Sequence, residues 1–222
     1  MFKIKAIIHD WDDTITNSFE TYAGWYKDFA DFYGLRIPTL EEVKPHWART
    51  VPEIIAGVWD TLTLEDATAK FANFIPQRIY DPQLFVGVRE CFEILGKKGI
   101  IFGVLTSGTE FKTKQIYRKY LDENYSFHEF VLCREDCEYH KPDPKVFDLS
   151  LKLLGARGIK KEEIVYVGDH TIDFESAKNA DLNFVAVTTG VIDKSKFLDL
   201  GMLEKNILDS FSDLPEYLGF NK

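Results

Sequence analysis

The stretch KIKAIIHDWDDTITNS, residues 3–18, places a short apolar run directly before a cluster of acidic and hydroxyl side chains. Residues 3–9 are rich in isoleucine and are bounded by polar residues, which predicts a buried β-strand. Asp10 and Asp12 follow this run, and side chains two positions apart in an extended segment point the same way. The two carboxylates can therefore share one site. Alone, such a pair is weak evidence, because acidic loops are common and are usually just solvated.

The chain beyond residue 85 alternates between helical and strand patterns. Helices are expected over residues 88–98, 110–121, 145–155 and 174–180, and strands over residues 100–105, 129–133, 164–167 and 183–189. Alternation of this kind predicts a parallel sheet that helices cover on both faces, which is a Rossmann-like α/β core. The tail, residues 193–222, is expected to form short helical pieces that pack on this core.

The segment between the first strand and residue 85 has helix signals and no strand pattern. Pairs with capping-box spacing predict helix starts at Asn17 with Glu20, Thr39 with Glu42, Thr50 with Glu53, and Thr63 with Asp66. We therefore expect a small α-helical domain over residues 17–84. It would be inserted into a catalytic core made of residues 1–16 and 85–222.

The composition excludes several classes of partner. With 36 acidic and 27 basic side chains among 222 residues, the formal charge is -9, which argues against a nucleic-acid-binding face. No apolar run is long enough for a signal peptide or a membrane span. The odd, sparse set of Cys91, Cys133 and Cys137 fits reduced thiols, and His140 adds no usable zinc spacing. We expect a cytoplasmic protein, a monomer or homodimer, without nucleic-acid or membrane partners.

Two further strand ends carry candidates for phosphate binding, since ligands of open parallel sheets bind beyond the carboxyl ends of the strands. Thr106, Ser107 and Gly108 follow one strand, and their hydroxyl and backbone N–H groups suit a phosphate oxygen. A plain helix N-cap is the commoner role of such a segment. Lys141, between a histidine and a proline, is either a surface lysine or a point charge held over a phosphate.

The last strand end carries a second pair of carboxylates. Asp169 comes just past the strand, and Asp173 lies one helical turn later on the same side. Oxygen ligands without a cysteine or histidine cluster suit Mg²⁺. Asp173 could equally be an ordinary acidic residue in the first turn of a helix. Taken in order, the strand ends supply a nucleophile, a proton donor, phosphate clamps and a metal site, which are the parts of a phosphoryl-transfer centre.

These stretches resemble the motifs of the haloacid dehalogenase superfamily. The matching segments are IIHDWDDTITNS (7–18), FGVLTSGT (102–109), YHKPDPKVF (139–147) and VYVGDHTIDFESAKNADL (165–182). The helical insert is similar to that of the branch with a helical cap, such as phosphoglycolate phosphatases and β-phosphoglucomutases. The resemblance implies the fold of that superfamily, with Mg²⁺ as cofactor and a small phosphorylated metabolite as substrate.

The resemblance also implies the role of each carboxylate. Asp10 attacks phosphorus and forms an aspartyl-phosphate, and it also ligates Mg²⁺. Asp12 protonates the leaving alcohol and then activates the hydrolytic water, while its backbone carbonyl binds the metal. Asp169 binds Mg²⁺ directly. Because a halide leaves without a proton, a carboxylate at Asp12 argues for phosphate ester chemistry over dehalogenation.

Further roles implied by the resemblance concern the phosphoryl oxygens. Thr106 and Lys141 hold them, with Ser107 and Gly108 completing the phosphate-binding segment. Lys141 also offsets the carboxylate charge, and Asp173 orients either the water shell of the metal or Lys141.

Two positions depart from the family pattern. One loop of the insert carries candidate substrate-binding residues. Asp13 stands where the family often has glycine, and Asn17 stands where aspartate is common. In the insert, His46 and Arg49 could contact a polar or anionic substrate group. Alternatively, Arg49 is a surface charge and Trp47 belongs to the core of the insert.

The leading hypothesis is a Mg²⁺-dependent phosphohydrolase similar to phosphoglycolate phosphatase. A phosphomutase similar to β-phosphoglucomutase would share every core residue, and it differs in passing the phosphoryl group to a sugar hydroxyl. A non-catalytic binding or regulatory protein of this fold would be indicated by loss of Asp10 or Asp12. Both residues are present.

Overall fold

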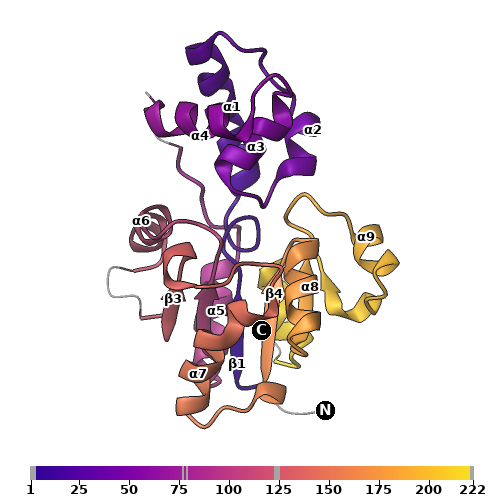
Figure 1. Cartoon of the computed structure of the whole chain (residues 1–222). Helices are drawn as coiled ribbons and strands as arrows, with labels where there is room; N and C mark the ends of the chain where they lie inside the picture. Colours follow the sequence, from indigo (N-terminus) through magenta and orange to yellow (C-terminus); the bar gives the residue numbers. More distant parts are fainter. Residues whose placement is uncertain (1–3, 77, 79, 123–125, 221–222) are drawn as a thin grey trace. The chain divides into compact units, whose positions relative to one another are not determined.

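The chain forms two compact units, which are described separately. The computed structural model describes residues 4–76, 78, 80–122 and 126–220 (Figure 1). Met1–Asn17 and Gln83–Lys222 form one unit, called the core unit below, and Ser18–Pro82 form the other, called the helical unit. The boundaries predicted from the sequence were residues 17 and 85.

A parallel sheet with the strand order β3-β2-β1-β4-β5-β6 forms the centre of the core unit. Every paired strand runs parallel to its neighbour, which confirms the predicted α/β class. The strands are β1 (Ala6–His9), β2 (Ile101–Leu105), β3 (Phe130–Leu132), β4 (Ile164–Gly168), β5 (Asn183–Val187) and β6 (Ile207–Leu208). The central position of β1 brings Asp10 between the ends of β2 and β4.

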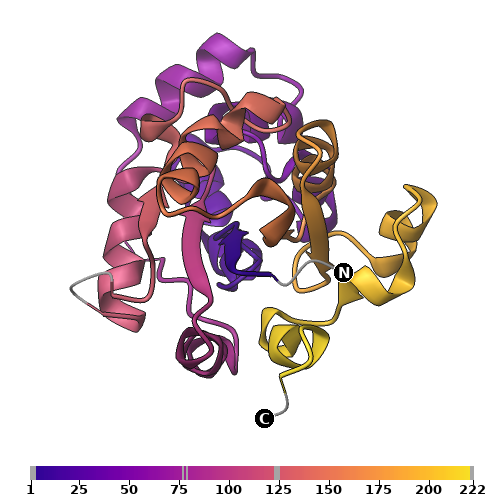
Figure 2. The same ribbon diagram turned by 90° about the horizontal axis from the view of Figure 1, so that it is seen from below.

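Helices connect these strands (Figures 1 and 2). They are α5 (Val88–Lys97), α6 (Glu110–Tyr120), α7 (Asp148–Ala156), α8 (Thr171–Asn179) and α9 (Lys194–Asp199), and α10 (Leu214–Tyr217) follows the last strand. Helix α8 begins three residues earlier than predicted, at Thr171. The side chain of His170 accepts a hydrogen bond from the backbone N–H of Ile172 and caps the helix there.

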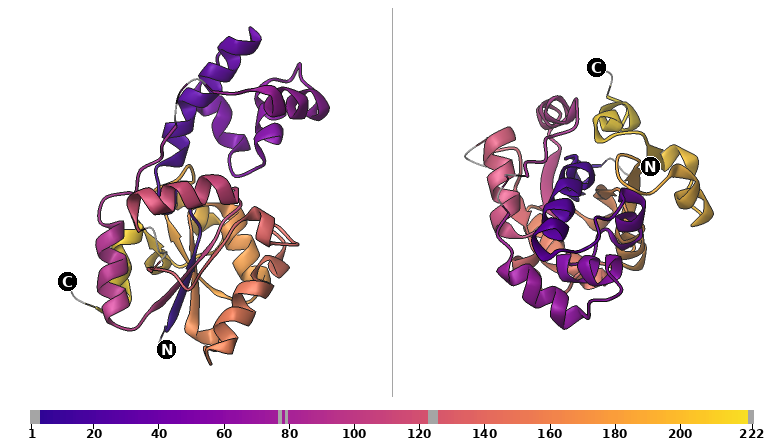
Figure 3. Two further views of the ribbon diagram at one scale, coloured as in Figure 1. Left: turned by 90° about the vertical axis from the view of Figure 1, so that its left-hand side faces the viewer. Right: turned by 90° about the horizontal axis from the view of Figure 1, so that it is seen from above.

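Both faces of the sheet are buried, because successive strand residues point to opposite sides. Ile7 packs in one apolar cluster with Phe92 of α5 and Leu214 of α10. Its neighbour Ile8 packs in the other cluster with Ala177 of α8. In the left view of Figure 3, α5 lies on one side of the sheet and α7 on the other. Packing on both sides fixes the strands, and with them the residues that follow each strand.

The helical unit consists of α1 (Ser18–Tyr33), α2 (Leu40–Val43), α3 (Val51–Val58) and α4 (Leu64–Asn73), with a 3₁₀ turn at Lys44–His46. Its core is aromatic: Trp25 stacks on Phe29 with 5.2 Å between ring centroids. Complete capping boxes begin α2 and α4, as predicted from the sequence. None of the helices in the described ranges is long and apolar enough to cross a membrane.

Candidate active site

Asp10 lies at the carboxyl end of β1, where the chain leaves the sheet. Its backbone N–H donates to the carbonyl of Val167 at 2.9 Å, which continues the pairing with β4 for one residue. Its side chain is 13% exposed, and Oδ1 lies 3.0 Å from Nζ of Lys141. Burial raises the pKa of Asp10 to about 7, although Lys141 counteracts part of the rise. A further cation would hold this carboxylate in its charged, nucleophilic form.

Lys141 is fixed by three oxygen atoms. Besides Asp10, its Nζ donates to Oδ1 of Asp173 at 2.7 Å and to the hydroxyl of Tyr166 at 3.0 Å. The Tyr166 hydroxyl in turn donates to the same Asp173 oxygen at 2.9 Å, and the His170 N–H donates to the other oxygen at 3.0 Å. Burial lowers the pKa of Lys141, but Asp10 and Asp173 outweigh it and hold that pKa above its ordinary value. Lys141 therefore stays charged.

Asp169 is buried beside the acidic loop that follows β1. The Thr14 hydroxyl donates to Oδ1 of Asp169 at 2.8 Å. Burial, and next the charge of Asp13, raise the pKa of Asp169 well above its ordinary value. A Cβ at Gly190 would overlap with Oδ2 of Asp169, so a larger residue here would displace that carboxylate. Neither Thr14 nor Gly190 was predicted from the sequence, where the one signal for them is their position past a strand.

Asp10, Asp169 and Asp173 offer carboxylate oxygens that all lie within 4.8 Å of one another. Among the described residues, these three form the one group of acidic, histidine or cysteine side chains that is close enough to hold a metal ion. Oxygen donors fit Mg²⁺, and the raised pKa values of Asp10 and Asp169 reflect a burial of negative charge that a divalent cation would relieve. Since both Asp173 oxygens already accept hydrogen bonds, Asp10 and Asp169 are the better-placed ligands.

Asp12 lies next to the segment that follows β2. A Cβ at Gly108 would lie 3.2 Å from Oγ1 of Thr106 and 3.4 Å from Oδ2 of Asp12, so both side chains lie close to Gly108. The Thr106 hydroxyl accepts a hydrogen bond from the Gly108 N–H at 3.0 Å, and Ser107 is exposed. Nζ of Lys112, on α6, donates to Oδ1 of Asp12 at 3.0 Å. Lys112 was not predicted from the sequence, because it lies outside any motif.

The two departures from the family pattern have local explanations. Asp13 has a φ of 58°, in the left-handed region that glycine adopts freely and aspartate tolerates better than most residues. Its carbonyl accepts a hydrogen bond from the Thr189 hydroxyl at 2.6 Å. Oδ1 of Asn17 accepts from the backbone N–H of Gln83 at 2.7 Å, which joins the two chain segments that border the helical unit.

The residues predicted to contact substrate in the helical unit differ in exposure. His46 packs against Gly57 of α3, where an added Cβ would overlap with its ring, and its Nδ1 is buried without a hydrogen-bond partner in the described chain. Arg49 is exposed. Trp47 packs edge-on against Phe19 at 5.1 Å, as expected of a residue in the core of this unit. The substrate contacts of His46 and Arg49 remain a prediction.

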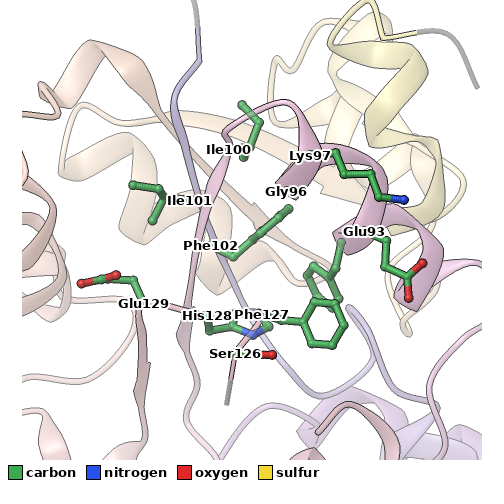
Figure 4. Close-up of a pocket in the computed structure, with 11 residues that line it drawn as sticks. Glu93, Gly96, Lys97, Ile100, Ile101, Phe102, Ser126, Phe127, His128 and Glu129 are labelled. Atoms are coloured by element: carbon green, nitrogen blue, oxygen red, sulfur yellow. The ribbon is translucent and has the colours of Figure 1, made fainter. Parts of the chain in front are cut away.

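A pocket of about 380 Å³ lies beside the amino-terminal part of β2 (Figure 4). Its lining includes Phe92, Phe102 and His128, and it contains none of the predicted site residues. His128 is hydrogen-bonded through Nε2 to Nε2 of His9 at 2.7 Å, and His9 contacts the carbonyl of Asp10 through Nδ1 at 2.6 Å. The candidate site is therefore the cluster at the strand ends, not this pocket.

Comparisons with known proteins agree on one family. The profile of the haloacid dehalogenase-like hydrolases matches residues 7–187. The chain is 31% identical over 202 residues to pyrophosphatase PpaX of Halalkalibacterium halodurans, covering 83% of this chain and 84% of that protein. It is 28% identical over 230 residues to a phosphoglycolate phosphatase of Photorhabdus laumondii, covering 97% and 93% of the two chains.

The fold is similar to that of solved structures as well. CbbY from Rhodobacter sphaeroides, solved in complex with phosphate, superimposes with a TM-score of 0.73 at 19% identity, covering 97% of this chain and 99% of that one. At this level of identity the likeness shows the fold alone.

Proposed function

The chain belongs to the haloacid dehalogenase-like hydrolase family, as a phosphatase, and we propose that it hydrolyses a small phosphorylated metabolite with Mg²⁺ through an aspartyl-phosphate on Asp10. The observation that carries the proposal is the position of the Asp10 carboxylate, 3.0 Å from the buried Lys141 ammonium. One of its oxygens also lies within 4.8 Å of an Asp169 oxygen. The substrate is proposed to resemble that of phosphoglycolate phosphatases.

The first step transfers the phosphoryl group to the protein. A carboxylate oxygen of Asp10 attacks phosphorus while the bond from phosphorus to the ester oxygen breaks. Asp12 donates its proton to that departing oxygen, which leaves as an alcohol. Lys141, Thr106 and the Ser107–Gly108 backbone hold the phosphoryl oxygens during the transfer.

The second step returns Asp10 to its starting form. Asp12, now a carboxylate, takes a proton from a water molecule whose oxygen attacks phosphorus. The bond between phosphorus and the Asp10 oxygen breaks, which releases inorganic phosphate. Asp12 thereby regains the proton that it gave to the leaving group, so one carboxyl serves as acid and then as base.

The metal would be held by the side chains of Asp10 and Asp169 and by the backbone carbonyl of Asp12. When bound, Mg²⁺ supplies positive charge that offsets the phosphoryl oxygens and the carboxylates. Thr14 orients Asp169 through its hydrogen bond, and Asp173 orients Lys141. His46 and Arg49 of the helical unit are proposed to contact the organic part of the substrate.

The test measures phosphate release from 2-phosphoglycolate and from an aryl phosphate, with Mg²⁺ and with a chelator in its place. The unmodified protein should act only with Mg²⁺, and Asp10→Asn should reduce the rate to below about one-thousandth. Asp199→Asn, an exposed change on α9, is the control and should leave the rate unchanged.

Two outcomes would contradict the proposal. Absence of phosphate release by the unmodified protein, across a panel of phosphorylated metabolites, would indicate a binding or regulatory protein. Formation of glucose 6-phosphate from β-glucose 1-phosphate, with little free phosphate, would indicate a phosphomutase.

A further inference from the structure

Two lysines serve the two halves of the candidate site. Lys141 contacts Asp10 and Asp173, and its side chain is 2% exposed. Lys112 contacts Asp12 at 3.0 Å, and its side chain is 29% exposed. The proposed roles of Asp10 and Asp12 differ, since one binds phosphorus and the other protonates the leaving oxygen. Lys112 therefore lies on the leaving-group side.

The ion pair between Lys112 and Asp12 contributes little to the stability of the fold. Lys112 lies in the first turn of α6, where the helix dipole disfavours positive charge. Its ion pair with Asp12 is partly open to solvent on both sides, and pairs of that kind contribute little to folding. Lys114, two residues further, pairs instead with Glu110 of the same helix, as an ordinary surface lysine does.

The leaving group of a substrate must come close to Lys112. An oxygen that takes a proton from Asp12 lies within about 3.2 Å of that carboxyl. The group attached to this oxygen is then a neighbour of the Lys112 ammonium, which is 3.0 Å from the same carboxyl. If that group were an anion, the carboxylates of Asp10 and Asp169 would repel it without a cation at this place.

We infer that Lys112 binds a second anionic group of the substrate, carried by the leaving group one or two atoms from the scissile oxygen. The inference rests on the proposed function, because it takes Asp12 as the proton donor. The substrate class is then a phosphate ester of a short hydroxy acid or a phosphoanhydride. The substrate anion replaces Oδ1 of Asp12 as the partner of Lys112.

The test compares three substrates in Lys112→Gln and in the unmodified protein, all with Mg²⁺. In 2-phosphoglycolate the second anion is a carboxylate, in inorganic pyrophosphate it is a phosphoryl group, and ethyl phosphate has none. Lys112→Gln should lower kcat/KM roughly 10- to 100-fold for at least one anionic substrate, as expected for a lost charged hydrogen bond. Ethyl phosphate reports what Lys112 contributes through Asp12 alone, so the ratio of kcat/KM for the responding anionic substrate to that for ethyl phosphate should fall roughly tenfold or more. Which anionic substrate responds identifies the anion.

Two further variants separate charge from structure. Lys114→Gln removes the same charge from the same helix away from Asp12, and it should leave all three values unchanged. Lys112→Met keeps the apolar stem and should reproduce the selective loss of Lys112→Gln. Thermal unfolding of each variant checks that it is folded.

An equal fall for all three substrates would overturn the inference, because Lys112 would then act only by holding Asp12. No fall for either anionic substrate would overturn it too. Both results leave the proposed function standing, since the unmodified protein still hydrolyses phosphate esters. If the unmodified protein hydrolyses neither anionic substrate but releases phosphate from other metabolites, this inference fails and the proposed function stands. Absence of phosphate release from the whole panel would overturn both.

Discussion

At the scale of single residues, side chains without reactive groups shape the candidate site. Gly190 leaves the space that Oδ2 of Asp169 occupies, and Thr14 donates a hydrogen bond to the other oxygen of that carboxylate. The position of the Asp169 carboxylate therefore depends on the space beside Gly190 and on the hydrogen bond from Thr14. Gly190 and Thr14 thus determine where the Asp169 carboxylate is available to a bound cation. Substitutions at both positions can therefore be tested through metal-dependent activity.

Gly190→Ala should displace Asp169, because the new methyl group overlaps with its carboxylate. A ligand displaced by an ångström or so costs about 10²-fold in rate, so we expect a loss of that order in Mg²⁺-dependent phosphatase activity. Gly155→Ala on α7 is the control, since a Cβ there meets no atom within 4 Å. Equal activity of Gly190→Ala and Gly155→Ala would contradict the placement of Asp169 as a metal ligand.

Thr14→Val should weaken Mg²⁺ binding while leaving the fold intact. It removes the hydroxyl that donates to Asp169 at 2.8 Å and keeps the branched shape of the side chain. Loss of a partner that orients a metal ligand typically costs 10- to 100-fold in metal affinity, and we expect at least about tenfold. The measurement is the Mg²⁺ concentration that gives half-maximal activity. Thr14→Ser retains the hydroxyl and should stay close to the unmodified protein.

The residues of the site divide into those that sequence reasoning could find and those that it could not. Asp10, Lys141 and Asp169 follow predicted strand ends in recognisable polar stretches, and the structure brings them together. The role of Thr14 depends on a partner 155 positions away, and that of Lys112 on one 100 positions away. No local pattern encodes such pairs, because only the folded sheet brings them into contact.

At the scale of elements, apolar runs could be predicted and short or capped elements could not. Strands β1, β2, β4 and β5 have near-continuous apolar sequences, as expected of parallel strands buried on both faces. Strand β6 has only two residues, too few to show a period, and the sequence analysis expected helical pieces alone in that region. Helix α8 begins at Thr171, before the predicted residue 174, because the His170 side chain caps it, although Thr171 and Ile172 are β-branched and have low helix propensity.

The capping box of α4 gives a prediction at this scale. Oγ1 of Thr63 accepts from the Asp66 N–H at 3.1 Å, and Oδ2 of Asp66 accepts from the Thr63 N–H at 3.1 Å. Thr63→Ala removes the first bond and should destabilise the helix by about 1 kcal/mol. Hydrogen exchange should accelerate at the α4 amides and stay unchanged in β4. Thr68→Ala, within the same helix, replaces a hydroxyl by the best helix former and should not accelerate exchange.

At the scale of the whole molecule, the core unit contains a chain of buried polar rings behind the candidate site. The Tyr117 hydroxyl is hydrogen-bonded to Nδ1 of His128 at 2.6 Å, and Nε2 of His128 to His9 at 2.7 Å. Phe92 packs edge-on against His128. Burial, and next the proximity of His9, lower the pKa of His128 well below its ordinary value. This ring is therefore neutral in the folded protein near neutral pH.

The pH dependence of stability should report this buried histidine. In the unfolded chain His128 binds a proton below a pH of about 6.5, whereas in the folded protein its lowered pKa keeps it neutral. The unfolded state then binds more protons, so acid favours unfolding. This group should remove about 1.4 kcal/mol of stability per pH unit below about pH 6.5.

His128→Gln, which cannot take up a proton here, should be less stable at pH 7 but lose less stability between pH 7 and pH 5. Urea unfolding at pH 5, 6 and 7 measures both effects, with the exposed His140→Gln as control. The carboxylates and His9, whose pKa burial lowers to about 4, are present in all three proteins. Equal slopes for His128→Gln and the unmodified protein would therefore mean that His128 carries its proton in the folded state as well.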